Sequence, residues 1–134
     1  MRQRILMVDD ERDLVFAVRL FLESYGYEFL AAYEGREAIE LLGTEDPLPD
    51  LVILDVYMPR MSGWDVLRMI RGSERTRSLP VIMLTAAKED SDVARGHVIG
   101  ADWYQIKPFK NEDLLLIIQR VLATRGELPE LPEP

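Results

Sequence analysis

The chain has 134 residues, 48% of them hydrophobic and 30% charged, which fits one compact domain with a real apolar core. Its formal net charge of −8 argues against direct binding of nucleic acid, because a protein that grips phosphates needs a basic face. It has no cysteine, which excludes disulfides and thiolate metal sites, and no apolar run of the roughly 18 residues that a membrane span needs. The N-terminus carries no export signal, so we expect a cytoplasmic protein without membrane association.

Short apolar runs alternate with longer amphipathic segments along the chain. The first run, at residues 5–8, predicts a strand, and the helical stretch after it is closed by Gly26 as a C-cap. Residues 27–31 can form a second strand, and residues 34–42 a short helix that Gly43 ends.

Residues 51–54 are the clearest strand of the sequence. Every position is apolar, as expected for a parallel strand whose two faces are covered by helices. The elements expected after it, in chain order, are a helix at 64–71, a strand at 81–84, a helix at 88–99, a strand at 102–106 and a helix at 111–124.

Five strand–helix units within about 125 residues predict a parallel sheet, because parallel strands need crossover connections. We therefore expect one α/β domain at residues 1–125, a doubly wound (βα)5 sandwich of the flavodoxin-like kind. Its five parallel strands should lie in the order 2-1-3-4-5, with helices on both faces of the sheet. Residues 126–134 hold three prolines and three glutamates, and are expected to form an acidic proline-rich tail or the start of a linker.

Polar residues with useful chemistry stand at the carboxyl ends of these strands. They are Asp9, Asp10, Asp55, Thr85 and Lys107. In a doubly wound sheet the carboxyl ends of the strands open on one edge, where ligands bind, so these side chains should meet there. Taken singly, each is explained as well by a helix cap, a turn or an exposed charge, but their joint placement favours a functional site.

The predicted cluster suits phosphoryl chemistry. Three converging carboxylates repel one another unless a divalent cation lies among them, and oxygen ligands without Cys or His favour Mg²⁺, for which Mn²⁺ could substitute. A carboxylate can also act as a nucleophile and form an aspartyl phosphate. The charge of a transferring phosphoryl group is met by Mg²⁺, a lysine and hydrogen-bond donors, and Lys107 and Thr85 supply the last two.

Several segments of the chain resemble the signature segments of response-regulator receiver domains, the CheY-like phosphoacceptor domains of two-component signal transduction. They are residues 7–11 (MVDDE), 55–63 (DVYMPRMSG), 84–86 (LTA) and 100–109 (GADWYQIKPF). They occur in the family's order and spacing, and the resemblance runs from residue 4 to residue 124. It implies that residues 1–125 are a receiver domain and not an enzyme acting on other molecules, one that catalyses only its own Mg²⁺-dependent phosphorylation and dephosphorylation.

The resemblance also implies roles within the polar cluster. Asp55 would be the phosphoacceptor and Lys107 its ion-pair partner. The Mg²⁺ ligands would be Asp9, Asp10, Asp55 and the backbone carbonyl of Tyr57. Thr85 would swing its hydroxyl toward the phosphoryl group, and Tyr104, three residues before the lysine, would be the aromatic switch. The peptide bond between Lys107 and Pro108 is expected to be cis.

These roles imply a phosphorelay signalling function. A sensor histidine kinase or a histidine phosphotransfer protein would donate its phosphoryl group to Asp55. The modification would alter the surface formed by the fourth helix, the fifth strand and the fifth helix, as a population shift between two states. That surface would regulate an unknown output partner or an attached effector domain, since any action on DNA has to come from outside this acidic chain.

Two features depart from the commonest family pattern. Trp103 and Ile117 stand where the transcription-factor branch carries the charged pairs of its dimer, so a dimer of that salt-bridged kind is in doubt. They could instead form an apolar contact, Trp103 could simply pack locally, and a phosphorylation-dependent homodimer stays open. Tyr57, which with small Ala87 flanks the path of water to the phosphoryl group in this family, predicts slow loss of phosphate because its ring can screen water.

Three other functions fit parts of the pattern. A phosphohydrolase of the haloacid dehalogenase type uses the same residue types, but it needs a second Asp where Tyr57 stands. A dinucleotide-binding module is disfavoured, because neither a G-x-G-x-x-G nor a G-x-x-x-x-G-K-[ST] segment occurs. A pseudo-receiver that signals without phosphorylation is disfavoured by the complete polar cluster.

The remaining charged features predict ordinary surface. His97, the only histidine, falls in the helix expected at 88–99 and should be a surface or partly buried residue rather than a phosphotransfer group. A local basic run predicts a solvated helix end rather than a kinase or nucleic-acid contact. It consists of Arg68, Arg71, Arg75 and Arg77.

Overall fold

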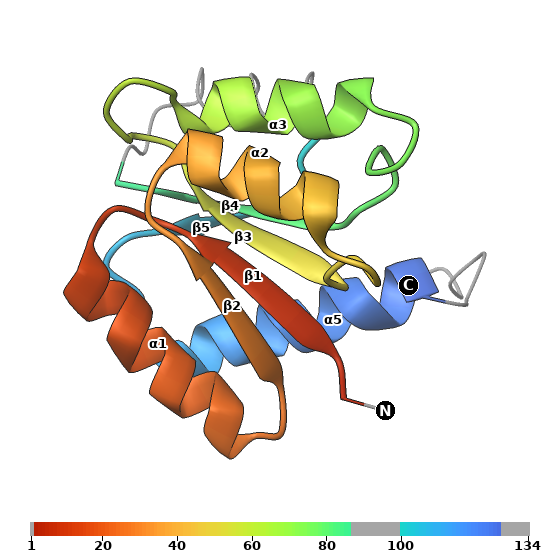
Figure 1. Ribbon diagram of the computed structural model, residues 1–134. Coiled ribbons are helices and arrows are strands. Elements are labelled where there is room, and N and C mark those ends of the chain that lie inside the picture. Colours follow the sequence, from red (N-terminus) through yellow and green to blue (C-terminus); the bar gives the residue numbers. More distant parts are fainter. Residues whose placement is uncertain (1, 87–99, 127–134) are drawn as a thin grey trace.

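A parallel sheet of five strands in the order β2-β1-β3-β4-β5 forms the centre of the protein (Figure 1). Its strands are β1 (Arg4–Val8), β2 (Glu28–Ala32), β3 (Leu51–Asp55), β4 (Val81–Thr85) and β5 (Trp103–Ile106). The computed structural model describes residues 2–86 and 100–126. The helix expected at 88–99, with His97, lies outside the described residues, as do Ala87 and the tail after residue 126. The predicted fold class and strand order are confirmed.

Helices cover both faces of this sheet. Those within the described residues are α1 (Arg12–Ser24), α2 (Gly35–Thr44), α3 (Gly63–Gly72) and α5 (Asn111–Gly126). In Figure 1, α2 and α3 lie on one face of the sheet, and α1 and α5 lie on the other. The core is accordingly divided into two apolar clusters, one joining the sheet to α2 and α3 and one joining it to α1 and α5. Among the described helices, none is both long and apolar enough to pass through a membrane.

The central strands hold the core and set the positions of the polar residues that follow them. Every residue of β3 and β4 is buried, as the uninterrupted apolar runs predicted. The strand β1 pairs with both β2 and β3, and β4 pairs with both β3 and β5, always in parallel. Asp55 and Thr85 are the last residues of β3 and β4, so buried, paired strands fix the backbone that carries them.

The two glycines expected at helix ends behave differently. Gly26 lies just beyond α1 with φ of 92°, the left-handed conformation that a C-cap glycine adopts, which confirms that prediction. Gly43 lies inside α2, so the prediction that it ends the helix is wrong. The helix runs on to Thr44, and the chain turns away only as it approaches Pro47, a residue that cannot continue a helix.

The start of α3 fixes the loop that follows β3. Ser62 and Asp65 form a capping box, in which each side chain accepts a hydrogen bond from the backbone N–H of the other residue. Gly63 then packs directly on the end of β3. A Cβ atom on Gly63 would lie 2.1 Å from the carbonyl oxygen of Asp55, so only glycine fits there. This close approach holds the backbone of Asp55 against the first turn of α3.

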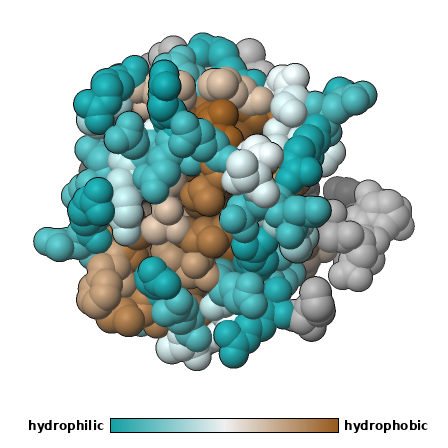
Figure 2. Space-filling view, in the orientation of Figure 1, coloured by the Kyte–Doolittle hydropathy of each residue, from teal (hydrophilic) through white to brown (hydrophobic). Residues whose placement is uncertain are grey.

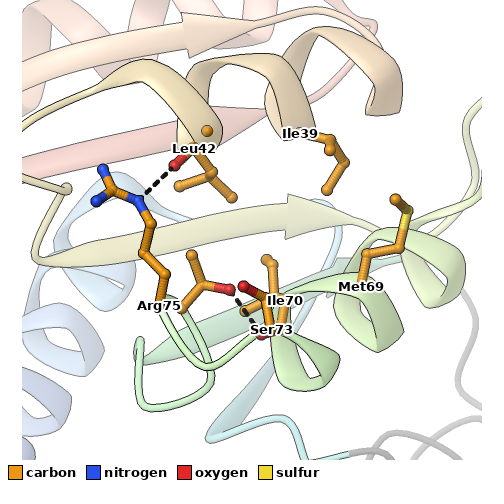
Figure 3. Close-up of a pocket in the computed structure, with 8 residues that line it drawn as sticks. Ile39, Leu42, Met69, Ile70, Ser73 and Arg75 are labelled. Carbon is orange, nitrogen blue, oxygen red and sulfur yellow. Dashed lines mark hydrogen bonds between the residues drawn. The ribbon is translucent and has the colours of Figure 1, made fainter.

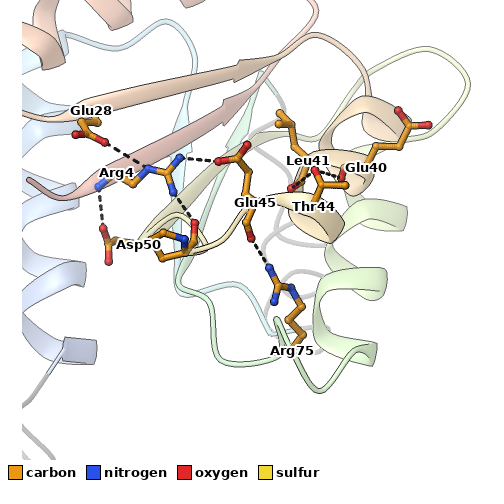
Figure 4. Close-up of polar contacts among 9 residues, drawn as sticks. Arg4, Glu28, Glu40, Leu41, Thr44, Glu45, Asp50 and Arg75 are labelled. Atoms are coloured by element: carbon orange, nitrogen blue, oxygen red, sulfur yellow. Dashed lines mark hydrogen bonds and ion pairs between the residues drawn. The ribbon is translucent and has the colours of Figure 1, made fainter.

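A cluster of ion pairs around Arg4 closes the amino end of the sheet (Figure 4). The Arg4 guanidinium lies 3.4 Å from the carboxylate of Glu28 and 2.7 Å from that of Glu45. The backbone N–H of Arg4 donates to Asp50 at 2.8 Å. Arg75 adds a hydrogen bond to the backbone carbonyl of Glu45. These contacts tie β1 and β2 to the loops beside α2, so the cluster has a structural role.

The basic run is only partly the solvated helix end that the sequence predicted. Arg68 and Arg77 are solvated, with side chains 52% and 59% exposed. The prediction is wrong for Arg71, whose side chain is 17% exposed. Arg75 is exposed as predicted, but it also donates to backbone carbonyl oxygens. Both acceptors of Arg75, and Gly100 and Asp102 among those of Arg71, lie 29 to 33 positions away in the sequence, so local charge patterns could not reveal these contacts.

An exposed apolar patch lies on α1. Figure 2 has the same orientation as Figure 1 and shows hydrophobic residues gathered over this helix at the lower left. Phe16 and Leu20 are 61% and 54% exposed, and their spacing of four residues puts them on the same side of the helix. We call these two residues the α1 patch. Exposed apolar patches of this kind commonly mark contacts with other proteins.

Candidate functional site

The predicted polar residues lie at the carboxyl edge of the sheet, where the parallel strands end. Asp9 and Asp10 follow β1, Asp55 ends β3, and Lys107 follows β5. One ligand oxygen from each of the three aspartates lies within 4.8 Å of the other two. Asp9 is fully buried and Asp55 is 4% exposed, whereas Asp10 is exposed to solvent. The topology therefore brings three carboxylates and one ammonium group together, as the strand pattern predicted.

Asp9 has one satisfied oxygen and one that is not. Its Oδ1 accepts a hydrogen bond of 2.9 Å from the backbone N–H of Glu11. Its Oδ2 lies 2.9 Å from the Lys107 amine, but this ion pair lacks hydrogen-bond geometry, and the atom has no hydrogen-bond partner among the described residues. Burial raises the pKa of Asp9, and the hydrogen bond from the backbone N–H of Glu11 and the contact with Lys107 oppose this rise. This buried oxygen thus has the positive charge of Lys107 beside it but no directed donor, so it keeps lone pairs that a metal cation can bind.

The pKa of Asp55 is raised to about 7. Burial is the largest cause, and the negative charge of Asp9 adds to it, with a smaller contribution from Asp10. Lys107 and a hydrogen bond from the backbone N–H of Tyr57 act in the opposite direction. A carboxylate held at such a place is costly to ionise unless positive charge is nearby, and perturbed groups of this kind cluster at functional sites.

Lys107 is shared among three carboxylates. Its Nζ atom lies 2.6 Å from Glu11, 2.9 Å from Asp9 and 3.5 Å from Asp55. Burial lowers the pKa of Lys107, but the hydrogen bond to Glu11 and the contact with Asp9 outweigh burial and raise it overall. The contact with Glu11 is the shortest, and the sequence prediction missed it. Glu11 stands directly after the acidic pair in the chain, which is the one signal that could have suggested it.

The site residues fit a hard divalent cation. The donor set consists of carboxylate oxygens from Asp9, Asp10 and Asp55, with no nitrogen or sulfur ligand among them. Mg²⁺ prefers such oxygen ligands and usually takes only a few carboxylates from the protein. The mutual repulsion of the aspartates and the unsatisfied Oδ2 of Asp9 would both be relieved by a cation at this position.

Thr85 and Tyr104 occupy neighbouring strands beside this cluster. Thr85 is fully buried at the end of β4, and its backbone carbonyl accepts a hydrogen bond of 2.8 Å from the N–H of Lys107. Tyr104 is half-buried on the face of the sheet that α3 covers, and its ring centroid lies 6.2 Å from that of Trp64. The peptide bond between Lys107 and Pro108 is cis, as predicted.

The positions that depart from the commonest pattern are partly exposed. Tyr57 follows β3 with 55% of its surface exposed, and Trp103 in β5 is 40% exposed. Ile117 is half-buried in the cluster that joins the sheet to α5. Trp103 is thus only partly packed against its own domain, and the apolar contact between Trp103 and Ile117 remains a prediction.

Two of the hollows among the described residues adjoin the site. One measures about 400 Å³ and is lined by Glu11, Leu14, Ala86, Lys107, Pro108 and Phe109. The next, of about 370 Å³, is lined by residues 10–14. A further hollow, of about 200 Å³, lies between α2 and α3, where the side chains of Ile39, Leu42 and Met69 converge (Figure 3). Arg75 borders it and donates to the backbone carbonyl of Leu42 at 3.3 Å. The hollow between α2 and α3 includes none of the polar site residues.

Residues 5–119 match the sequence profile of the family described as response regulator receiver domain. The transcriptional regulatory protein CpxR of Escherichia coli is 40% identical over 119 residues, which cover 89% of this chain and 49% of that protein. The alkaline phosphatase synthesis transcriptional regulatory protein PhoP of Bacillus subtilis is 36% identical over 128 residues, or 96% of this chain and 51% of that protein. The chain spans about half the length of these curated relatives.

Solved structures with the same fold are also similar in sequence. The chemotaxis protein CheY4 of Vibrio cholerae superposes with a TM-score of 0.85 at 32% identity, covering 90% of this chain and 99% of that chain. The receiver domain of the sensor histidine kinase PA1611 of Pseudomonas aeruginosa gives 0.82 at 29% identity, covering 92% and 99%. That structure holds a magnesium ion coordinated in its active-site cleft.

Proposed function

Because the chain belongs to the response-regulator receiver domain family, we propose that Asp55 accepts a phosphoryl group from a phosphohistidine on a sensor histidine kinase or on a histidine phosphotransfer protein. The observation that carries the proposal is the setting of Asp55 at the end of β3. Its carboxylate is nearly buried, lies beside Asp9 and Asp10, and has the Lys107 amine 3.5 Å away. Ionising Asp55 beside two other carboxylates is unfavourable, and residues held in such unfavourable positions are commonly functional.

In the proposed reaction, a carboxylate oxygen of Asp55 attacks the phosphorus atom of the phosphohistidine. A P–O bond forms and gives an acyl phosphate, while the P–N bond breaks and its electron pair leaves with the histidine ring, which takes up a proton from solvent. Lys107 would balance the charge on the phosphoryl oxygens, because its amine already lies between Asp55 and Asp9. The chain would catalyse only this transfer and the later hydrolysis of its own acyl phosphate.

The carboxylates of Asp9, Asp10 and Asp55, with the backbone carbonyl of Tyr57, would hold Mg²⁺, or Mn²⁺ in its place. When bound, the ion would supply positive charge against the phosphoryl oxygens. The oxygen-only donor set and the unsatisfied Oδ2 of Asp9 support this assignment. The magnesium ion in the related Pseudomonas aeruginosa domain supports it independently.

Thr85 and Tyr104 would carry the switch. Thr85 follows Leu84, the residue of β4 that pairs with Asp55, so its side chain belongs to the neighbourhood of the acceptor. A phosphoryl dianion on Asp55 would draw the Thr85 hydroxyl toward it as a hydrogen-bond donor. Tyr104, now beside Trp64, would then pack further inward and change the surface of β5 and α5.

The output would come from a partner or from an effector domain attached after residues 1–125, with residues 126–134 as a tail or the start of a linker. CpxR and PhoP, which are about twice as long, are transcriptional regulators. The net charge of −8 argues that this chain itself does not bind nucleic acid. We propose a cytoplasmic location, to which the lack of cysteine is suited.

The α1 patch would form part of the surface that the phosphodonor protein contacts. The helix begins directly after Asp9, Asp10 and Glu11, so a partner that brings its phosphohistidine to Asp55 also approaches α1. Phe16 and Leu20 are largely exposed there and offer apolar area that a partner could bury.

The direct test is phosphorylation of the purified chain. It is incubated with Mg²⁺ and acetyl phosphate, and intact mass is measured for the wild type and for Asp55→Asn. A phosphate-sized gain in the wild type alone supports the proposal. No gain in the wild type, with acetyl phosphate or with a phosphorylated histidine kinase as donor, would overturn it in favour of a pseudo-receiver that signals by protein contacts.

A further inference from the structure

We propose that Glu11 is a positioning residue that competes with Asp55 for Lys107 and holds the lysine back from the acceptor before phosphorylation. This inference deepens the proposed function and rests on it. Its basis is the order of distances around the lysine amine, 2.6 Å to Glu11 and 3.5 Å to Asp55. The group expected to serve the acceptor is thus paired most closely with a different carboxylate.

The contact with Glu11 also differs in kind from the other two. Lys107 donates a hydrogen bond to Glu11 Oε1, whereas its approach to Asp9 Oδ2 leaves that atom without a hydrogen-bond partner among the described residues. The 3.5 Å separation from Asp55 is at the outer limit of a hydrogen bond. The shortest directed bond of the lysine is therefore made to an exposed carboxylate, not to the buried acceptor.

The position of Glu11 in the fold leaves its side chain available for this contact. Glu11 is the N-cap residue of α1, yet its side chain makes no capping hydrogen bond. It reaches instead across 96 positions of sequence to the end of β5. The Glu11 side chain is 62% exposed, whereas Asp9 and Asp55 are buried, so its ion pair with Lys107 is screened by water and readily exchanged.

These properties suit a holding contact that yields to a stronger partner. A phosphoryl dianion at Asp55 carries more negative charge than the Glu11 carboxylate and is less exposed to solvent. It would therefore bind the Lys107 amine more strongly than Glu11 does. Before transfer, part of the population would keep Lys107 on Glu11, and that part would be slower to accept the phosphoryl group. Removing the Glu11 charge should therefore speed phosphorylation.

The test compares two charge-removing variants of the full chain, Glu11→Gln and Asp13→Asn. Asp13 is an exposed carboxylate in the first turn of α1 and has no ion pair with Lys107 among the described contacts, so it controls for the change in net charge. The first readout is a crystal structure of each variant without metal. In Glu11→Gln the distance from Lys107 Nζ to Asp55 should fall from 3.5 Å to about 3 Å, and in Asp13→Asn it should not change.

The second readout is the rate of phosphorylation by acetyl phosphate at saturating Mg²⁺, measured against donor concentration. Glu11→Gln should raise the maximal rate about twofold to fivefold, the range that the loss of one exposed ion pair allows, and leave the half-saturating donor concentration unchanged. A lysine that stays in place, or a maximal rate equal to that of Asp13→Asn, would overturn the inference. If the wild type is not phosphorylated, the proposed function fails instead. The metal-free structures then still show whether the distance from Lys107 Nζ to Asp55 depends on Glu11.

Discussion

Arg71 and Asp102 form an ion pair of 3.1 Å that joins α3 to the residue preceding β5, and their side chains are only 17% and 15% exposed. The Asp102 carboxylate also accepts a hydrogen bond of 2.8 Å from the backbone N–H of Val81, the first residue of β4. The other acceptors of Arg71 are the backbone carbonyls of Arg77, Leu79 and Gly100. One guanidinium therefore fixes the turns that precede both β4 and β5, the two strands that would carry the switch residues.

Replacing Arg71 by methionine should destabilise the domain by about 2–4 kcal/mol, because it removes the positive partner of the largely buried Asp102 carboxylate and the donor to several backbone carbonyls. Arg68→Met is the matched control, since Arg68 pairs with Asp65 at 3.3 Å in solvent, with both side chains 52% exposed. That variant should lose less than about 0.5 kcal/mol. Urea unfolding at neutral pH measures both values. Equal losses would show that the Arg71 network adds nothing beyond a surface ion pair.

Gly63→Ala should be severely destabilising and should disturb the site. The added Cβ would meet the carbonyl oxygen of Asp55 at 2.1 Å and the Cα of Val56 at 2.8 Å, and both are backbone atoms that cannot move aside cheaply. We expect a loss of about 3 kcal/mol, the upper end of overpacking costs, together with weaker Mg²⁺ binding measured by calorimetry. Gly43→Ala is the control, because nothing lies within 4 Å of its Cβ position in α2. It should be neutral or stabilising by about 0.5–1 kcal/mol.

The stability of the metal-free protein should depend on the ionisation of Asp55. The pKa of Asp55 is about 7 in the folded chain against an ordinary value of 3.8, so the folded state binds the proton more tightly and loses stability as the pH rises between these values. Asp55→Asn should therefore be more stable than the wild type at pH 8, by on the order of a few kcal/mol. Its advantage should shrink as the pH falls toward 4.

Thermal unfolding in a chelating buffer from pH 4 to pH 8 measures this difference. Addition of Mg²⁺ should then raise the melting temperature of the wild type, because a ligand that binds only the folded state stabilises it, and should have little effect on Asp55→Asn. If the wild type instead becomes more stable relative to Asp55→Asn as the pH rises to 8 without metal, the assignment of the raised pKa to Asp55 is contradicted.

The sequence was sufficient for features that depend on pattern and insufficient for those that depend on long-range contacts. The uninterrupted apolar runs of β3 and β4 predicted buried parallel strands, and strand ends then placed Asp55 and Thr85 at one edge. The partners of Arg71 and of Glu11 could not be predicted, because they lie up to 31 and 96 positions away and depend on how the loops close. Local signals can also mislead. Gly43 was predicted to end a helix, but α2 continues through it because nothing at that position requires a turn.

The α1 patch should matter for transfer from a protein donor but not from a small molecule. The double variant Phe16→Ser, Leu20→Ser removes both apolar side chains of the α1 patch and leaves the carboxylate cluster unchanged. We expect about a tenfold slower transfer from a phosphorylated histidine kinase, equivalent to roughly 1.4 kcal/mol of lost contact, and an unchanged rate with acetyl phosphate. Equal slowing with both donors would mean that the substitutions disturb the site itself, and no slowing with either would remove α1 from the contact surface.

Tyr57 should prolong the life of the phosphorylated state. Hydrolysis requires a water molecule to attack the phosphorus atom, break the P–O bond to Asp55 and release inorganic phosphate. The backbone N–H of Tyr57 donates to the Asp55 carboxylate, so the Tyr57 residue lies next to the acceptor, and it is 55% exposed to solvent. Tyr57→Asn would remove a ring that can screen the water path and would leave a small polar group that can hold a water molecule.

We expect Tyr57→Asn to lose phosphate at least about threefold faster than the wild type, equivalent to roughly 0.7 kcal/mol off the barrier. The decay of the phosphorylated mass after removal of the donor measures the rate. Tyr25→Asn is the matched control, because Tyr25 is 56% exposed beyond the far end of α1, where its ring contacts Phe21. If Tyr57→Asn decays no faster than Tyr25→Asn, the ring does not screen the acyl phosphate, and its lifetime is set by residues that hold the phosphoryl group directly, with Lys107 the first to test.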